Sequence, residues 1–374
     1  MIKNIPIRIF ELIIKNQLLS AEDYELLINK TRENKYFLEL EICDRDPKTI
    51  SWDLLSEIVD QRSHLLQSVY PEISQALIKH NIQTVDESDT YHLLWYYWMP
   101  LAMRLAHQHQ QIGRTFIQGL LGGQGLGKTT LGLVLEILLK NLGKNFLSIS
   151  LDDIYKTYSD RQKLRELNPA IIWRGPPSTH DVGLGLQVLQ QLRDRPSTAA
   201  YPISIPRFDK SLHNGEGDRA KSDINYQADI VLFEGWFVGL RPLPISAFDV
   251  FISPILLDQD RQFAIDCNAH LHDYQSLWTY LDSLIVLIPE DFSYSLKWRL
   301  EAEHKLINSG KSGMSDQEVT KFVEYFWKAL HPDLFTSPMV SLDYKNSQVD
   351  PIIDLIIKVG RSHQPIGCKT QRNF

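Results

Sequence analysis

Hydrophobic residues follow two different patterns along the chain, which change near residue 110. Before that point apolar side chains recur at helical spacing, as at Leu54, Leu55, Ile58 and Val59. After it, short continuous apolar runs alternate with helix-like segments, a pattern typical of a parallel sheet covered by helices on both faces. We therefore expect an α/β fold with a three-layer α/β/α parallel sheet, preceded by a helical N-terminal extension.

Individual elements can be placed on this pattern. A helix is expected from Thr129 to Leu142, closed by Gly143, and another begins at the capping box Ser315-x-x-Glu318. Residues 340–345 and 352–359 could supply a last strand and helix. Strands are expected at 115–122, 145–151, 230–233 and 284–288.

These elements predict three parts: an extension at 1–110, an α/β domain at 111–360 and a polar tail at 361–374, which we expect to fray. The stretch 91–106 is rich in Trp and Tyr, with Pro100 expected to interrupt it. Such an aromatic cluster serves packing more often than ligand binding, so we expect the extension to buttress the α/β domain.

Composition excludes several classes of protein. The 374 residues carry a net charge of −7 and no basic tract, which argues against nucleic-acid binding. An anionic small molecule would therefore need a local cationic pocket. No apolar stretch reaches the roughly 18 residues of a membrane span. The sequence has no signal-peptide pattern, and Cys43, Cys267 and Cys368 form no CxxC pair. These features predict a cytoplasmic protein with free thiols.

One segment carries specific chemistry. An apolar run leads into Gly122-x-x-x-x-Gly127-Lys128-Thr129, and a helix pattern follows, which is the expected context of a P-loop. Backbone N–H groups and the helix N-terminus would hold the phosphates of a nucleotide, with Lys128 reaching the β and γ oxygens and Thr129 binding Mg²⁺. The alternative is a glycine-rich turn that binds nothing. The expected phosphate contacts are Gly122, Gly123, Gln124, Gly125, Leu126, Gly127, Lys128, Thr129 and Thr130.

Carboxylates follow two other expected strands. Asp152 and Asp153 end the strand at 145–151, and Glu234 ends the strand at 230–233. The carboxyl ends of parallel strands line the ligand crevice of such a sheet. Asp152 could accept a proton from a hydroxyl group, and Glu234 could hold Mg²⁺ or its water shell. The alternatives are a capping role for the Asp pair and an ordinary strand-end acid at Glu234.

Two polar loops lie between these strands, at 173–181 and 206–219. Their basic residues could form the cationic pocket that the net charge does not provide, or each could be a solvated surface group. His180 could contact substrate or hydrogen-bond at a helix start. The candidate cations are Arg174, Arg207, Lys210 and Arg219.

Several motifs together resemble one family. They are Ser150-Leu-Asp-Asp-Ile-Tyr155, Arg174-Gly with Thr179-His-Asp181, Pro206-Arg-Phe-Asp-Lys-Ser211, Gly217-Asp-Arg219, Val231-Leu-Phe-Glu-Gly-Trp236 and Trp298-Arg-Leu-Glu-Ala-Glu303. Over about residues 90–335 the chain resembles the plant and cyanobacterial type of D-glycerate 3-kinase. That family belongs to a P-loop kinase group with uridine kinase, pantothenate kinase and phosphoribulokinase, which implies a P-loop NTPase-type sheet.

The resemblance implies Mg²⁺-dependent transfer of the ATP γ-phosphate to the 3-hydroxyl of D-glycerate, as in photorespiratory salvage. Asp152 then takes the place of the base, Lys128 balances phosphate charge, and Arg299 lies on a lid helix that closes over ATP. The acceptor contacts implied are Asp153, Tyr155, Arg174, His180, Arg207, Lys210 and Arg219.

Other functions remain open. The chain could be another small-molecule kinase, acting on uridine, pantothenate or a sugar phosphate. It could be a non-catalytic nucleotide-binding module, with the extension as an interaction surface, or a P-loop ATPase or GTPase switch. The partner expected is a small molecule, with neither nucleic acid nor membrane involved, and the oligomeric state could be monomer or dimer.

Overall fold

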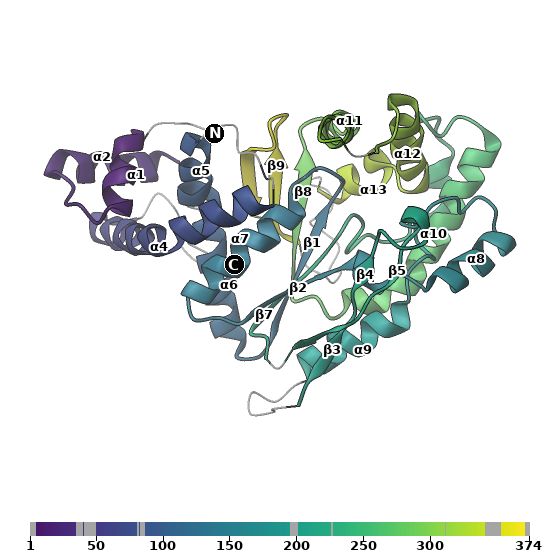
Figure 1. The fold of residues 1–374 in the computed structure, drawn as a ribbon, viewed down its shortest axis with the longest axis horizontal. Helices are drawn as coiled ribbons and strands as arrows, with labels where there is room; N and C mark the ends of the chain where they lie inside the picture. The colour runs from purple at the N-terminus through teal and green to yellow at the C-terminus, as the bar shows by residue number, and fades with distance from the viewer. Residues whose placement is uncertain are drawn as a thin grey trace.

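A central sheet of six strands organises the molecule (Figure 1). The computed structural model describes residues 5–34, 40, 50–80, 82, 87–194, 201–225, 227–310, 312–340 and 353–370. The strand order is β10-β9-β8-β1-β7-β2, and all neighbours run parallel except the edge strand β10, which is antiparallel to β9. The strands are β1 (Phe116–Gly122), β2 (Phe146–Ser150), β7 (Ile230–Gly235), β8 (Ser283–Pro289), β9 (Ile353–Val359) and β10 (Pro365–Thr370).

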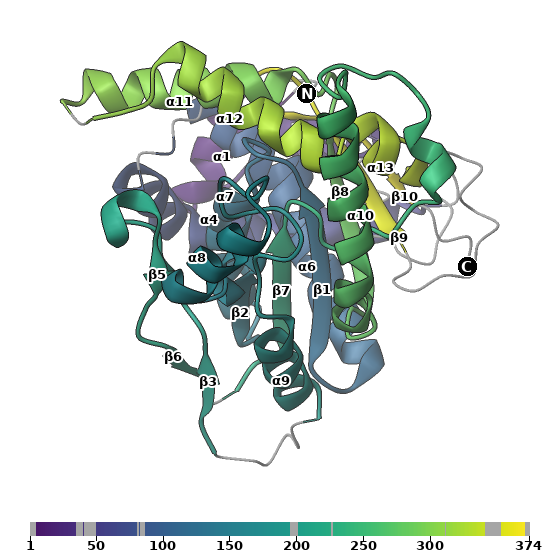
Figure 2. The same ribbon diagram turned by 90° about the vertical axis from the view of Figure 1, so that its right-hand side faces the viewer.

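Alternating side chains bury both faces of the sheet, which is why its strands appear in the sequence as continuous apolar runs. Along β1, for example, Leu120 joins one buried cluster and Leu121 the other. On the first face lie α6 (Met99–Ile112) and α7 (Lys128–Asn141). On the second lie α9 (Val182–Arg193), α10 (Asp258–Trp278), α12 (Asp316–Ala329) and α13 (Pro332–Met339). Figures 1 and 2 show the resulting three layers, so the expected α/β/α architecture is confirmed.

The N-terminal region is helical where it is described. Its helices are α1 (Ile7–Ile14), α2 (Ala21–Glu33), α4 (Trp52–Lys79), α5 (Glu87–Leu93) and the π-helix η2 (Leu94–Trp98). The aromatic residues of η2 are buried, and the Trp95 indole donates a 3.0 Å hydrogen bond to Thr31 Oγ1. The aromatic cluster thus serves packing. Pro100 lies directly after the π-helix η2, and residues 87–112 are helical throughout, so the regular α-helical pattern is interrupted before Pro100 while the helical path continues.

Local signals placed several helix ends correctly. Helix α7 begins at Lys128 and ends before Gly143, whose φ is +71°. Ser315 and Glu318 form a reciprocal capping box at the start of α12. Asp181 caps α9 by accepting a hydrogen bond from the Leu184 amide. Cys267 is a free, buried thiol and Cys368 is also buried, while Cys43 lies outside the described residues.

The C-terminal segment differs from expectation. Residues 353–359 form strand β9 and not a helix, and the expected frayed tail contains β10, with Cys368 buried against the sheet. Alternating polar residues in 361–370 hide this strand, because an edge strand is half exposed and lacks a continuous apolar run. The expectation for residues 341–345 lies outside the described residues.

Three further groups of elements complete the molecule. Helix α11 (Tyr294–Asn308) follows β8 and lies beside α12 (Figure 2). Helix α8 (Tyr158–Leu167) follows the short 3₁₀ turn η3 (Leu151–Ile154). Two small antiparallel ribbons contain the polar loop at 206–219; they pair β3 (Ile203–Ile205) with β6 (Asp223–Asn225), and β4 (Phe208–Asp209) with β5 (Asp218–Arg219). The polar loop at 173–181 joins α8 to α9.

Candidate active site

The P-loop joins β1 to α7 and has the backbone that an anion cradle needs. Gly125 and Gly127 have φ values of +79° and +78°, a conformation that L side chains rarely adopt. The Lys128 ammonium donates a 3.1 Å hydrogen bond to the Gly123 carbonyl, and the Thr129 side chain at the helix start is exposed. The loop therefore presents amide groups, a lysine and a hydroxyl toward one position in front of a helix N-terminus.

Strand register brings the predicted carboxylates to the same edge. Glu234 on β7 lies beside Leu120 of β1 on one side and Ser150 of β2 on the other. Its Oε2 is 4.0 Å from Lys128 Nζ. Burial raises the pKa of Glu234, and the Lys128 charge opposes that rise. Burial likewise lowers the pKa of Lys128. Both charges therefore lie in a poorly solvated position, which strengthens their effect on a bound phosphate.

Asp152 stands at the next strand end, in η3. Lys210 Nζ donates to its Oδ2 at 2.6 Å, and the Tyr155 hydroxyl donates to the same carboxylate. Burial alone would raise the pKa of Asp152, but the Lys210 charge and these two hydrogen bonds hold it below its usual value. The group is therefore an ionised carboxylate that can accept a proton.

Asp153 has a different environment. Its Oδ2 accepts hydrogen bonds from the Ser150 amide at 2.9 Å and from Arg207 Nη1 at 2.8 Å, closing the capping box of η3. Arg207 also binds Asp223 at 2.6 Å. Asp153 and Arg207 thus anchor the turn that presents Asp152, and their polar atoms are already engaged with the protein.

The other predicted cations converge on the same region. Arg174 Nη1 donates to the carbonyls of Gly215 and Glu216, at 2.7 and 3.0 Å, and its guanidinium lies over the Phe208 ring. Arg219 binds Asp181 at 2.6 Å and the Tyr155 carbonyl at 3.2 Å. Only carbonyls accept the described hydrogen bonds of Arg174, so its positive charge is available to an anion.

His180 is buried behind Asp152. The Tyr155 ring stacks on its imidazole, with ring centroids 4.5 Å apart, and Tyr274 Oη lies 2.8 Å from His180 Nδ1. Burial lowers the pKa of His180 to about 3, although the Asp152 charge acts in the opposite direction. The imidazole is therefore neutral at physiological pH. Tyr274 comes from α10, and no sequence motif marked it.

No contact between the described residues joins the Arg299 side chain to the P-loop. It pairs with Glu303 on α11, and its guanidinium lies over Phe322 of α12. Its neighbour Trp298 is the residue that packs on the P-loop, since a Cβ added to Gly125 would lie 2.8 Å from its ring. His363 Nδ1 is 2.8 Å from the Gly125 carbonyl, and its ring lies against Trp298. The sequence signalled neither of these contacts.

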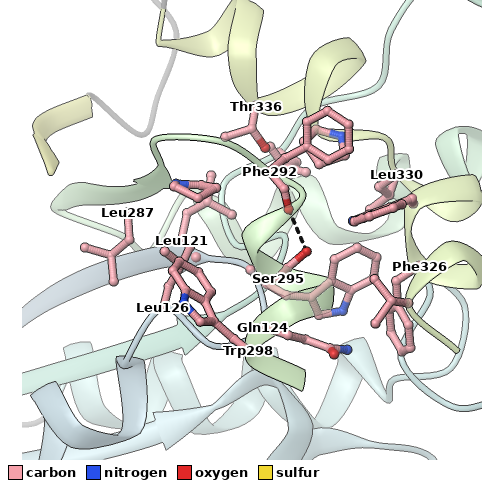
Figure 3. A pocket seen from close by; sticks show the side chains of 18 residues that line it. Leu121, Gln124, Leu126, Leu287, Phe292, Ser295, Trp298, Phe326, Leu330 and Thr336 are labelled. Atoms are coloured by element: carbon pink, nitrogen blue, oxygen red, sulfur yellow. Dashed lines mark hydrogen bonds between the residues drawn. The ribbon is translucent and has the colours of Figure 1, made fainter. Parts of the chain in front are cut away.

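An apolar cavity of about 90 Å³ lies on the other side of the same loop. Figure 3 shows Leu121 and Leu126 facing Phe326 and Leu330 across it, with Gln124 at one end. Ser295 Oγ donates a 2.8 Å hydrogen bond to the Phe292 carbonyl. Its hydroxyl proton is therefore already bound to another residue of the cavity wall. The cavity lies between the P-loop and α11, α12 and α13, and α11 carries the predicted lid residue Arg299.

Two properties of the described residues bear on cofactors and location. They contain no group of three or more His, Cys, Asp or Glu side chains arranged to hold a metal. The Mg²⁺ ligands expected from the sequence, Thr129 and Glu234, lie at the P-loop and at the end of β7. Among the described helices none is long and apolar enough to cross a membrane.

The chain is similar to known kinases. No protein-family model matches the chain. It is 33% identical over 254 residues to D-glycerate 3-kinase, chloroplastic, of Arabidopsis thaliana, which covers 65% of this chain and 52% of that protein. It is 34% identical over 230 residues to the uncharacterized kinase mug58 of Schizosaccharomyces pombe, covering 59% of this chain and 82% of that protein.

A solved structure extends the likeness to three dimensions. D-glycerate 3-kinase from Cryptococcus neoformans superposes with a TM-score of 0.62 at 27% identity, over 73% of this chain and 97% of that one. The chain spans about half the length of the Arabidopsis relative but most of the fungal ones. With its P-loop, its parallel sheet and these relatives, the chain belongs to the P-loop kinase family that contains D-glycerate 3-kinase.

Proposed function

We propose that the protein is an ATP-dependent kinase that phosphorylates D-glycerate at its 3-hydroxyl, giving 3-phosphoglycerate and ADP. The observation that carries the proposal is the convergence of Lys128, Glu234 and Asp152 at adjacent strand ends, with Lys210 bonded to Asp152. The choice of D-glycerate is supported by the names of two relatives. A role in photorespiratory-type salvage, and a cytoplasmic location, remain predictions.

In this mechanism the residues of the chain mainly position and neutralise charge. Asp152 accepts the proton of the 3-hydroxyl while that oxygen bonds to the γ-phosphorus. The bond between this phosphorus and the oxygen bridging to the β-phosphate breaks in line, and the electron pair leaves with ADP. Mg²⁺, held by Thr129 and Glu234, would supply charge compensation on the phosphates.

The acceptor carboxylate needs a cationic partner, and two residues suit it. Lys210 is 60% exposed at its side chain and already reaches Asp152, so it can bridge between the base and an incoming anion. Arg174 is held only by carbonyls in its described hydrogen bonds. Asp153, Arg207 and Arg219 are engaged with the protein, which favours a supporting role for them around the acceptor.

The first test is Mg²⁺-dependent ADP release with D-glycerate, uridine, pantothenate, ribulose 5-phosphate or no acceptor. We expect turnover with D-glycerate alone, and loss of both nucleotide binding and turnover in Lys128→Ala. Lys140→Ala is the matched control, because Lys140 is an exposed lysine in the last turn of the same helix.

Each other result assigns a different function. Turnover with another acceptor would identify another small-molecule kinase, and ADP release without acceptor would indicate an ATPase. Nucleotide binding without turnover on any acceptor would support a non-catalytic binding module. If Lys128→Ala behaves like Lys140→Ala, the P-loop assignment is wrong.

A further inference from the structure

Two buried polar atoms in the segment just before α9 have no hydrogen-bond partner among the described residues. They are His180 Nε2 and Ser178 Oγ, on side chains of residues that are 2% and 6% exposed. Buried polar groups in folded proteins are almost always paired, because an unpaired one has lost its hydrogen bonds to water without replacement. Ser178 also has a φ of +89°, a strained value for a residue with a side chain. A site that keeps two unpaired polar atoms is arranged for a polar ligand.

Tyr274 decides which nitrogen of His180 carries the proton. Its Oη accepts a hydrogen bond from the Ser178 amide at 3.1 Å, and the His180 amide also points at this oxygen. A phenol has one proton to donate, and the atom left to receive it is His180 Nδ1, 2.8 Å away. The opposite assignment would leave the proton of a fully buried hydroxyl without an acceptor. A neutral imidazole whose Nδ1 accepts a hydrogen bond has its own proton on Nε2.

The imidazole is also fixed in orientation. Tyr155 stacks on one face of the ring, and Phe237 and Tyr274 approach it edge-on, with centroids 5.5 and 5.7 Å from it. Tyr155 is the residue whose hydroxyl binds Asp152, and the Asp152 charge is close enough to act on His180. The unpaired Nε2–H therefore belongs to the surroundings of the candidate base.

We propose that Tyr274 is a positioning residue that fixes His180 as its Nε2–H tautomer, so that this N–H donates a hydrogen bond to an oxygen of the acceptor. The inference rests on the proposed function, in that the acceptor is a small hydroxy acid held beside Asp152. A neutral donor orients such an oxygen without adding a positive charge that would compete with Lys210 for Asp152. Burial, which lowers the pKa of His180 to about 3, keeps the donor neutral at physiological pH.

NMR of the full-length protein with ¹⁵N-labelled histidine tests the tautomer directly. Long-range ¹H–¹⁵N spectra at neutral pH should show His180 with a protonated Nε2 and a bare Nδ1. Adding D-glycerate should shift the Nε2–H resonance. A proton on Nδ1 would overturn the tautomer assignment, and an Nε2–H resonance that does not respond to D-glycerate would overturn the acceptor contact.

Kinetics separate positioning from a general structural effect. Tyr274→Phe should raise the KM for D-glycerate about tenfold, the effect of one misdirected hydrogen bond, while the KM for ATP changes less than about twofold. Tyr325→Phe is the control, because Tyr325 is a buried tyrosine of the same core cluster that donates one hydrogen bond, to the Trp173 carbonyl. Equal losses in the two variants, or equal rises in both KM values, would contradict the proposal.

A double-mutant cycle supplies an independent result. In His180→Gln the side-chain amide provides an N–H donor that does not depend on Tyr274, so Tyr274→Phe should add no further loss in that background. Additive losses would contradict the proposal. If the wild-type protein phosphorylates none of the acceptors, the proposed function fails, whereas the tautomer and its response to D-glycerate are still decided by NMR.

Discussion

Two neighbouring carboxyl groups, Asp152 and Asp153, have opposite pKa shifts because they face different partners. Burial raises the pKa of both, but at Asp152 the charge and hydrogen bond of Lys210 outweigh it, whereas at Asp153 the Ser150 amide and Arg207 do not. The sequence predicted a carboxylate at this strand end and ranked Asp152 first. The capping role that the sequence left open holds at Asp153, which forms a local capping box with Ser150, whereas the arrival of Arg207 from 54 residues away left no local signal.

Replacing the carboxylate of Asp152 tests its role as the base. Asp152→Asn keeps the shape of the side chain but cannot accept the hydroxyl proton, so turnover should fall by roughly 10²–10⁴ while ATP binding is nearly unchanged. Steady-state kinetics and nucleotide titration measure the two effects. Asp160→Asn, an exposed aspartate in the first turn of α8, serves as control. Unchanged turnover in Asp152→Asn would remove this residue from the mechanism.

The same residue sets the acid limit of activity. The pKa of Asp152 in the folded protein lies below the usual value of about 3.9, so the carboxylate is ionised above that pH and is lost as a base only when the pH falls through its lower pKa. The wild-type pH profile should therefore show no decline from this group between neutral pH and about pH 5.

At the scale of elements, the sequence predicted the helices and strands that depend on neighbouring residues. It did not predict those that depend on contacts between residues far apart in the chain. The P-loop, the strands β1, β2, β7 and β8 and the capped starts of α9 and α12 all follow from residues adjacent in sequence. The edge strand β10 and the contact from His363 to the Gly125 carbonyl do not, since the latter joins residues 238 positions apart. Tyr274 likewise reaches His180 across 94 positions. Such pairings depend on the assembled fold and leave no local pattern.

The packing of α11 on the P-loop gives a prediction at this scale. In Gly125→Ala the new Cβ would lie 2.8 Å from Trp298 Cε3 and 2.9 Å from its Cβ, and an L residue at φ +79° costs about 1–2 kcal/mol. We expect the KM for ATP to rise about tenfold or more, because either the loop or α11 must move. Nucleotide titration and steady-state kinetics measure this change.

Gly143→Ala separates the steric clash from backbone strain. Gly143 follows α7, the helix that the P-loop leads into, and its φ is +71°. No described atom lies within 4 Å of a Cβ added to it. This variant should lose about 1–2 kcal/mol of stability with little change in the KM for ATP. If Gly125→Ala shows no larger effect on ATP than Gly143→Ala, the contact with Trp298 does not hold the loop.

On the scale of the whole molecule, the hydrophobic core crosses the sequence division near residue 110. One buried cluster joins Phe10, Leu66 and Trp95 of the N-terminal helices to Leu138 of α7 and Ile357 of β9. Arg104 on α6 binds Asp354 on β9 at 2.7 Å, with both side chains 1% exposed. The change of hydrophobic pattern along the sequence therefore marks a change of local structure, and residues on both sides of it share one core.

This ion pair predicts how the molecule unfolds. Arg104→Leu leaves the Asp354 charge buried without its guanidinium, so the free energy of unfolding should fall by about 3–5 kcal/mol. Because the core is shared, urea unfolding followed by far-UV circular dichroism and by tryptophan fluorescence should give one coincident transition in both wild type and variant. Arg104→Leu combined with Asp354→Leu should be more stable than Arg104→Leu alone, since the unpaired charge is removed. Two separate transitions would show that the N-terminal helices fold independently of the sheet. If the double variant is no more stable than Arg104→Leu, the loss in the free energy of unfolding comes from packing rather than from charge.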